Sequence, residues 1–483
     1  MNRAPNFPWP ALAISALAVL AACTVGPDYT RPSAETPPAF KEAAGWKRSK
    51  PLDTVPRGAW WSVYGDPVLD SLEREVEISN ETIKAADAAF RQSRALAHEA
   101  EASFFPVVGT TGSAQRSGTG AQAGGRVANQ FNLTTSASWE LDLWGRIRRQ
   151  IEASVATAQA SAADLANAQL SAQAALATDY LELRVSDELK HLLDEAVVDF
   201  QKSLVISQNK YRAGVVAKSD VASAQALLDG TRAAAINVGV TRATLEHAIA
   251  VLIGKPPAEF SIAPAAFTIQ VPTIPVELPS TLLERRPDIA ATERLVQASN
   301  AQIGAAVAAY YPTLTLSGSY GFSNSMLSKL IEGPSSLWAV AGQAAETLFD
   351  FGLRSAQVEA ARATFDQNVA TYRETVLSGF QQVEDDLATL RILEEQQGVQ
   401  ASAVKSAREA VQLFLNQYKA GTIDYTSVIT AENTALQDQE SELTILRDRL
   451  AASVALIEAL GGGWDATHLP SDEQLDEGRK LFP

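Results

Sequence analysis

The residue types that most often carry catalysis are present here without a catalytic arrangement. Gly118-Thr119-Gly120 lies between two expected strands and is not a dinucleotide-binding turn, and Gly254-Lys255 lacks the glycine that precedes a phosphate-binding lysine. The carboxylates of Glu384-Asp385-Asp386 match a solvated helix face. The histidines show no metal-ligand spacing; they are His98, His191, His247 and His468. We therefore expect no enzyme activity, no metal and no diffusible cofactor.

One residue is expected to be chemically modified. Cys23 is the single cysteine of 483 residues, which excludes an intrachain disulfide and a Cys-based metal cluster. It follows Arg3, an apolar stretch at 11–22 and the small residues Leu20-Ala21-Ala22, which together are typical of a bacterial lipoprotein signal peptide. We predict that Cys23 is the acylated first residue of the mature chain, anchored in outer-membrane lipid. The alternative is an ordinary signal peptide cut near Ala22.

The elements that position these residues are long. Residues 131–143 alternate between apolar and polar side chains, as in a strand with two unlike faces. From 146 to about 211 the chain is rich in Ala and free of Gly and Pro, so the pattern predicts a helix of 66 residues, roughly 99 Å long. A turn at Ala213-Gly214 and a return helix at about 219–253 follow. No compact domain of ordinary size contains such a hairpin.

The same unit occurs twice. Tyr211-Arg212-Ala213-Gly214 matches Tyr418-Lys419-Ala420-Gly421 at an offset of 207 residues, and Phe105-Pro106 matches Tyr311-Pro312 at 206. Asp142 and Arg146 pair with Asp350 and Arg354 at 208. This agreement indicates a tandem duplication of a large unit, so the second half is expected to repeat two strands and a hairpin.

The predicted class is therefore mixed, mainly α, with four β-strands per chain. Prolines concentrate outside the long helices, as expected. We expect this order of segments: a signal peptide at 1–22, a lipid-anchored strap at 23–66, a helix at 67–104, strands at 105–143, a periplasmic helical hairpin at 146–254, a Pro-rich connector at 255–284, a helix at 285–310, strands at 311–350, a second hairpin at 352–460 and a tail at 461–483.

The strands have the length and pattern of membrane-spanning strands. Each has 10 to 13 residues, enough to cross a bilayer when tilted. Four strands cannot close a barrel, and open sheet edges are not tolerated in lipid, so several chains must share one barrel. The formal charge of −16 makes nucleic acid an unsuitable partner. Aromatic residues cluster at the helix-side ends of the strands, as in an interfacial girdle, although each one alone also fits ordinary packing: Phe104, Phe105, Trp144, Tyr310, Tyr311, Phe349 and Phe351.

The order of several short motifs resembles the TolC/OprM-like outer-membrane factors, in their lipoprotein (NodT-type) branch. The motifs are Cys23-Thr24-Val25-Gly26-Pro27-Asp28-Tyr29, Arg286-Pro287-Asp288, the two Tyr-x-Ala-Gly turns, and Ala459-Leu460-Gly461-Gly462-Gly463-Trp464. The resemblance implies a homotrimer with a 12-stranded barrel that continues into an α-helical periplasmic tunnel. It also implies a periplasmic adaptor and an inner-membrane pump of the resistance-nodulation-division (RND) type as partners, in the efflux of drugs or solvents.

The resemblance also assigns roles at the periplasmic tip. Asp220 and Tyr418 are similar to a locking pair, in which a hydroxyl donates to a carboxylate; the alternative is two solvated residues near a turn. Positions that often carry ring-forming Asp hold Ser427 and Thr430 here, with Asp424 nearby, so the gate is expected to be less charged than an acidic ring. Ile423 replaces an arginine of the lock, and Glu432 is out of register with the expected ring. The tip turns at Gly214 and Gly421 are expected to dock the adaptor.

Two alternative functions remain open from the sequence. One is the exit duct of a protein-secretion system, which the lipoprotein signal disfavours. The other is a non-conducting, lipid-anchored spacer, which would not need amphipathic strands.

Overall fold

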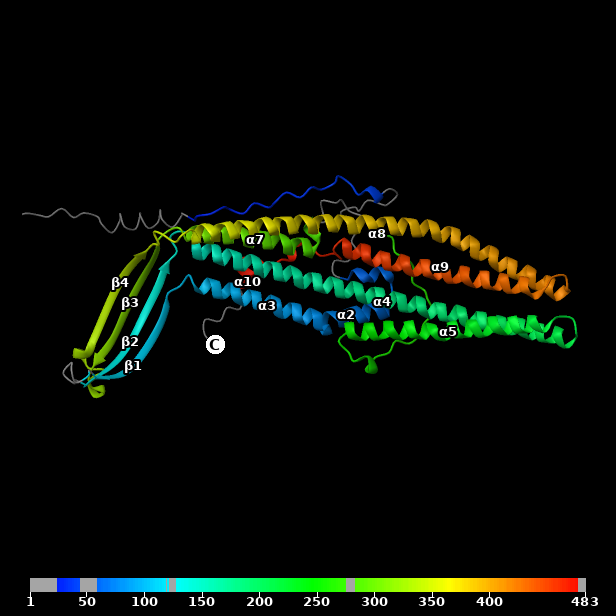
Figure 1. The fold of residues 1–483 in the computed structure, drawn as a ribbon, viewed down its shortest axis with the longest axis horizontal. Helices are drawn as coiled ribbons and strands as arrows, with labels where there is room; N and C mark the ends of the chain where they lie inside the picture. Colours follow the sequence, from blue (N-terminus) through cyan, green and yellow to red (C-terminus); the bar gives the residue numbers. More distant parts are fainter. Residues whose placement is uncertain (1–23, 44–58, 119, 121–126, 275–282, 477–483) are drawn as a thin grey trace, which may run out of the picture.

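The computed structural model describes residues 24–43, 59–118, 120, 127–274 and 283–476. The molecule is elongated, with a four-stranded sheet at one end and two helical hairpins that run to the opposite end (Figure 1). The predicted signal peptide and Cys23 lie outside the described residues, so the structure does not bear on the expected acylation.

Two long hairpins form most of the molecule. In the first, α4 (Arg146–Arg212) has 67 residues and α5 (Lys218–Leu252) has 35. In the second, α8 (Leu353–Ala420) has 68 residues and α9 (Tyr425–Ala459) has 35. The near-equal lengths agree with the duplication seen in the sequence. At 1.5 Å per residue, α4 and α8 each extend about 100 Å.

Three shorter helices pack beside the hairpins. α2 (Pro67–Ser79) and α3 (Glu81–Ala102) contact α4, and α7 (Pro287–Ala308) contacts both α4 and α8. The prediction of one unbroken helix at 67–104 is wrong, because the chain bends at Asn80. The Asn80 side chain accepts a hydrogen bond from the Ile83 amide at 3.0 Å and donates one to the Leu252 carbonyl at 2.7 Å. It therefore caps the new helix and ties it to the end of α5.

The sheet joins the two halves of the chain. Its strands are β1 (Val107–Gly118), β2 (Val127–Leu141), β3 (Thr313–Asn324) and β4 (Ser336–Ala345), in the order β1-β2-β3-β4. All neighbours are antiparallel, and β2 meets β3 in a register that runs from Phe131 opposite Asn324 to Leu141 opposite Leu314. Each strand lies within a few residues of its predicted position. The sheet leaves β1 and β4 as edge strands.

The N-terminal strap lies along the outside of α7 and α8 (Figure 1). Tyr29 donates a hydrogen bond to Glu293 of α7, and Asp28 accepts one from Arg149 of α4 at 2.8 Å. The backbone amides of Lys41 and Glu42 both donate to one carboxylate on α8, that of Glu384. In the described parts of the strap, regular structure is limited to two short 3-10 helices, at Lys41–Ala43 and Trp60–Tyr64. The described strap is thus mostly extended, and side-chain contacts hold it in place.

A buried ion network holds the start of the connector against the first hairpin. Asp187 of α4 accepts hydrogen bonds from Arg184 at 3.2 Å and from Arg242 of α5 at 2.8 Å. Both arginines also donate to connector carbonyls, Arg184 to Ala263 at 2.9 Å and Arg242 to Ile262. The Ala265 amide donates to Asp187 as well, at 3.4 Å. These bonds fix the position where the chain leaves α5 and crosses toward the second half.

The remaining described segments are short. They comprise 3-10 turns at Pro257–Glu259, Leu327–Lys329, Gly333–Ser335 and Ala466–His468, and the C-terminal α10 (Asp472–Asp476). His98 of α3 contacts the Leu475 carbonyl at 2.7 Å, which places α10 beside α3. Among the described helices, none combines the length and the apolar character that a membrane crossing needs.

Candidate functional site

Both hairpin turns lie at the end of the molecule farthest from the sheet (Figure 1). Gly214 follows α4 with a φ of +72°, and Gly421 follows α8 with a φ of +77°. Glycine adopts this left-handed conformation without steric cost, so each long helix ends where a Tyr-x-Ala-Gly motif allows the chain to reverse. Both glycines are exposed. Docking of an adaptor at these turns stays a prediction.

Just behind the turns, the two hairpins share a small apolar core, which we call the tip core. Two tyrosines occupy its centre, Tyr418 at the end of α8 and Tyr425 at the start of α9, with ring centroids 5.0 Å apart. Residues from both hairpins surround them. The buried members of the tip core are Phe200, Leu204, Ala224, Leu228, Tyr418, Tyr425 and Val428.

The predicted pairing of Asp220 with Tyr418 is not made within the described chain. The Tyr418 hydroxyl is buried and has no hydrogen-bond partner there, and the half-buried Asp220 carboxylate accepts from the Ser219 hydroxyl at 3.4 Å. Burial raises the pKa of Tyr418; the nearby Ser207 hydroxyl opposes this effect, and the charge of Asp220 adds to it. Tyr418 contacts Lys210 of α4 instead. The Lys210 ammonium donates to the Tyr418 carbonyl and lies 3.9 Å from the centroid of the Tyr418 ring. Asp220 and Tyr418 are close enough to interact electrostatically, but no hydrogen bond joins them within one chain.

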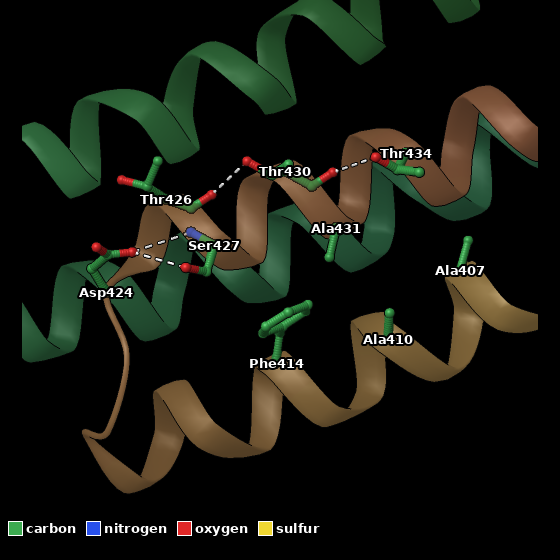
Figure 2. A pocket seen from close by; sticks show the side chains of 9 residues that line it. All are labelled: Ala407, Ala410, Phe414, Asp424, Thr426, Ser427, Thr430, Ala431 and Thr434. Atoms are coloured by element: carbon green, nitrogen blue, oxygen red, sulfur yellow. Dashed lines mark hydrogen bonds between the residues drawn. The ribbon is translucent and has the colours of Figure 1, made fainter.

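The three other predicted gate residues lie along one groove between α8 and α9, of about 470 Å³. Asp424 caps α9 by accepting from the Ser427 amide at 3.2 Å and from its hydroxyl at 3.1 Å, as Figure 2 shows. The Thr430 hydroxyl donates to the Thr426 carbonyl at 3.0 Å on its own helix. Phe414 points from α8 toward α9 across the groove (Figure 2). At these positions only Asp424 supplies a carboxylate, and a helix cap already uses it.

The sequence interpretation missed the role of Glu432. We expected this residue to be out of register, but its side chain is buried beside the tip core and accepts from Ser203 of α4 at 2.7 Å. Burial raises its pKa to about 7. The spacing of Tyr425, Val428 and Glu432 at i, i+3 and i+7 places all three on one helix face, and this signal could have revealed it.

At the opposite end, the same local structure turns each strand pair into a long helix. Asp142 accepts from the amides of Ile147 at 3.0 Å and Arg148 at 2.9 Å, and Asp350 accepts from that of Arg354 at 3.3 Å. Carboxylates at these positions satisfy the free amides of the first turn of the helix.

The side-chain partners at this junction differ between the halves, although the sequence repeat pairs Arg146 with Arg354. Arg354 donates to Asp350 at 2.5 Å, whereas Arg146 donates to Glu140 at 2.7 Å. Trp144 stacks on Tyr311 at 4.8 Å between ring centroids and so links the two junctions.

Comparison with known proteins identifies the molecule. Residues 72–255 and 278–462 match the family model described as outer membrane efflux protein. The chain belongs to this family. It is an outer-membrane efflux channel, as its motifs predicted, and the mainly helical fold class and the outer-membrane location are confirmed. The match spans both halves of the duplication.

Individual relatives are similar over nearly the whole chain. The toluene efflux pump outer membrane protein TtgC of Pseudomonas putida is 28% identical over 460 residues, covering 94% of this chain and 95% of that protein. The outer membrane protein OprJ of Pseudomonas aeruginosa is also 28% identical, covering 94% and 97%. The solved outer-membrane channel OprN superposes with a TM-score of 0.86 at 29% identity, covering 92% of this chain and all of that one. In the part of the chain that the structure describes, no group of side chains could hold a metal ion.

Proposed function

We propose that the protein is the passive exit duct of a tripartite efflux pump, in which an inner-membrane RND-type transporter and a periplasmic adaptor pass drugs, solvents or other small molecules to it. The duct carries out no catalysis and uses no cofactor. The observation that carries this proposal is the arrangement of one membrane-type sheet above two hairpins about 100 Å long, within a family of efflux channels. The toluene pump of the relative TtgC supports small apolar cargo.

The channel is a homotrimer, and the open sheet edges support this. Within the described residues, β1 and β4 each pair on one side only. Unpaired edges are not tolerated in a membrane, and a single-chain barrel needs at least about eight strands. Apolar side chains on both edge strands are widely exposed in one chain, including Val107 at 71% and Val340 at 80%. Pairing between the edge strands of neighbouring chains leaves no open edge and supplies enough strands to close a barrel. Three chains with four strands each give a barrel of 12 strands.

The helices provide a second, independent reason for assembly. α8 exposes Ile392, Val399 and Leu413, which are 53%, 69% and 54% accessible and are separated by multiples of seven residues. Heptad spacing of exposed apolar residues is the pattern of a helix that packs against a neighbouring helix. On α5, the other outer helix near the tip, Ile236 and Val240 are also exposed, at 76% and 65%. We assign these stripes to contacts between chains in the helical tunnel.

A planar-bilayer recording of the purified full-length protein tests the proposal. We expect discrete conductance steps, and a strain that lacks the gene is expected to become more susceptible to small toxic compounds. Intact drug tolerance with a loss of protein export would favour the secretion duct. An absence of conductance from correctly assembled protein would favour the non-conducting spacer.

The lipid anchor belongs to the same proposal. Cys23 carries the acyl chains that hold the strap at the membrane surface. Mass spectrometry of the mature N-terminus is expected to find an acylated Cys23. A chain cut near Ala22 and left unmodified would contradict the assignment.

The tip is proposed to be the gate and the adaptor-docking surface. Asp220 and Tyr418 form the latch in the assembled channel, and opening breaks their bond. Asp220→Ala is expected to raise single-channel conductance and antibiotic uptake; unchanged values would rule out the latch. The turns at Gly214 and Gly421 dock the adaptor, so bulky substitutions there are expected to abolish adaptor cross-linking while the trimer stays intact.

A further inference from the structure

Three hydroxyls and one carboxylate oxygen are buried near the tip without a hydrogen bond of good geometry in the described chain, although Ser207 lies close to Tyr418 and Ser203 close to Tyr425. They are the hydroxyls of Ser207, Tyr418 and Tyr425 and one oxygen of Glu432. All four side chains are at most 5% exposed. An unpartnered buried polar group costs on the order of 1–3 kcal/mol, so the packed tip is held together at a local energetic cost.

Glu432 is the ionisable group that links the two hairpins here. Its carboxyl lies on α9 and accepts from the Ser203 hydroxyl on α4 at 2.7 Å, while its second oxygen has no partner in the described chain. No ion pair of Glu432 occurs among the described residues. Burial and the lack of an ion-pair partner among the described residues therefore favour the neutral, protonated acid over the carboxylate.

The acidic groups near this site act in the same direction. Asp199 on α4 adds negative charge near Glu432. Asp220 on α5 acts on both Tyr418 and Tyr425, as Glu432 does on Tyr425. Two lysines on α4 are engaged elsewhere: Lys210 donates to the Tyr418 carbonyl on α8, and Lys202 pairs with Asp199 at 2.8 Å. An additional negative charge on Glu432 is therefore not compensated in the packed state.

We propose that Glu432 holds a proton while the two hairpins are packed together, and that its release to bulk water on exposure favours their separation, so that the tip opens more readily as the pH rises. This inference deepens the proposed duct function and rests on it. The step is a simple reversible dissociation: the O–H bond of the carboxyl breaks, and water or buffer takes up the proton. No other reactant is needed.

The direction and size of the effect follow from linkage. Burial raises the pKa of Glu432 from 4.5 to about 7 in the packed tip, and exposure to water returns it toward 4.5. The packed state is therefore fully favoured below about pH 4.5. It loses its advantage as the pH rises to about 7 and changes little above that. Over this window the ratio of open to packed tips is expected to rise by roughly a hundredfold or more.

The test measures the distance between the hairpin tips, so it needs no transported molecule. Spin labels are attached to the full-length protein at two exposed tip positions through Lys218→Cys and Lys419→Cys, and a sample without these substitutions measures any signal from Cys23. We expect the population with separated tips to grow between pH 5 and pH 8. Glu432→Gln, which mimics the protonated acid, is expected to keep the tips packed throughout. The control Glu409→Gln, an exposed carboxyl on α8, is expected to behave like the parent.

The outcomes separate this inference from the proposed function. A distance distribution that does not change with pH in the parent protein overturns the inference, and so does a pH response that survives in Glu432→Gln. Neither result bears on whether the protein conducts, because the planar-bilayer recording measures conduction in a separate experiment. Loss of conduction together with a normal pH response would instead overturn the duct and leave the proton-linked movement intact.

Discussion

Asp187 lies at the centre of the network that holds the start of the connector, and its replacement is expected to destabilise the protein. Its side chain is 5% exposed, and the side chains of Arg184 and Arg242 that bind it are 6% and 20% exposed. Asp187→Ala removes the carboxylate and leaves both cations close together in a largely buried site. Breaking a buried ion pair in this way costs about 3–5 kcal/mol.

The expected loss lies at the lower end of this range, because both arginines keep other acceptors. Arg184 retains the Ala263 carbonyl and the Tyr180 hydroxyl, at 2.9 Å each, and Arg242 retains Glu246 at 2.5 Å. We expect a destabilisation of about 3 kcal/mol. At roughly 2 °C per kcal/mol for a large chain, the apparent unfolding temperature is expected to fall by about 6 °C.

A matched control lies on the same helix. Asp194 forms an ion pair with Lys190 at 2.5 Å, but these side chains are 56% and 43% exposed. Exposed pairs contribute at most about 1 kcal/mol, so Asp194→Ala is expected to shift the unfolding temperature by less than about 2 °C. Both variants are compared with the parent in detergent by circular dichroism at one scan rate, because the apparent unfolding temperature depends on scan rate wherever unfolding is irreversible. Equal shifts for the two variants would refute the assignment of stability to the buried network.

Three further predictions concern single buried or tightly packed residues. Tyr418→Phe removes the hydroxyl that the proposed latch donates to Asp220, so the assembled channel is expected to lose roughly 1.5–3 kcal/mol of stability in denaturant titrations; an unchanged or higher stability would contradict the latch. Burial raises the pKa of Glu73 to about 9. The parent protein is therefore expected to lose stability relative to Glu73→Gln as the pH rises from about 4.5 to about 9, and the stabilities of the two proteins should converge below pH 4.5. Parallel stability profiles against pH would contradict this. A Cβ at Gly26 would lie 2.4 Å from the Gly304 Cα, so Gly26→Ala is expected to loosen the strap and increase its cleavage by protease. The control Gly65→Ala changes a glycine that also has a positive φ but has open space around it, and it should not increase cleavage.

The fold was largely predictable because its patterns are long and local. A run of 67 helical residues without Gly or Pro leaves no other interpretation, and the alternation along β3 identifies a strand without tertiary information. The break at Asn80 was missed because helical periodicity continues across it, and what decides it is a contact with the Leu252 carbonyl 172 residues away. The pairing of β2 with β3 could not be derived either, since register depends on partners that are far apart in the sequence.

The tip was predictable in its location but not in its contacts. Motif offsets correctly placed Tyr418 near the hairpin ends, yet the expected partner Asp220 does not bond to it in one chain. The lysine that binds the Tyr418 carbonyl, Lys210, comes from the other hairpin, and no local pattern identifies such a contact. Glu432 was overlooked because we compared it with an expected ring of acidic residues rather than with the buried face of its own helix.

The central claim is that one chain cannot seal a pore, so three chains combine their strands in one barrel. Native mass spectrometry of the full-length protein, extracted from outer membranes in mild detergent, tests this claim most directly. We expect a complex that contains three copies of the chain and separates into single chains only when the protein is denatured. A folded monomer that retains its β-structure and conducts ions by itself would contradict the claim.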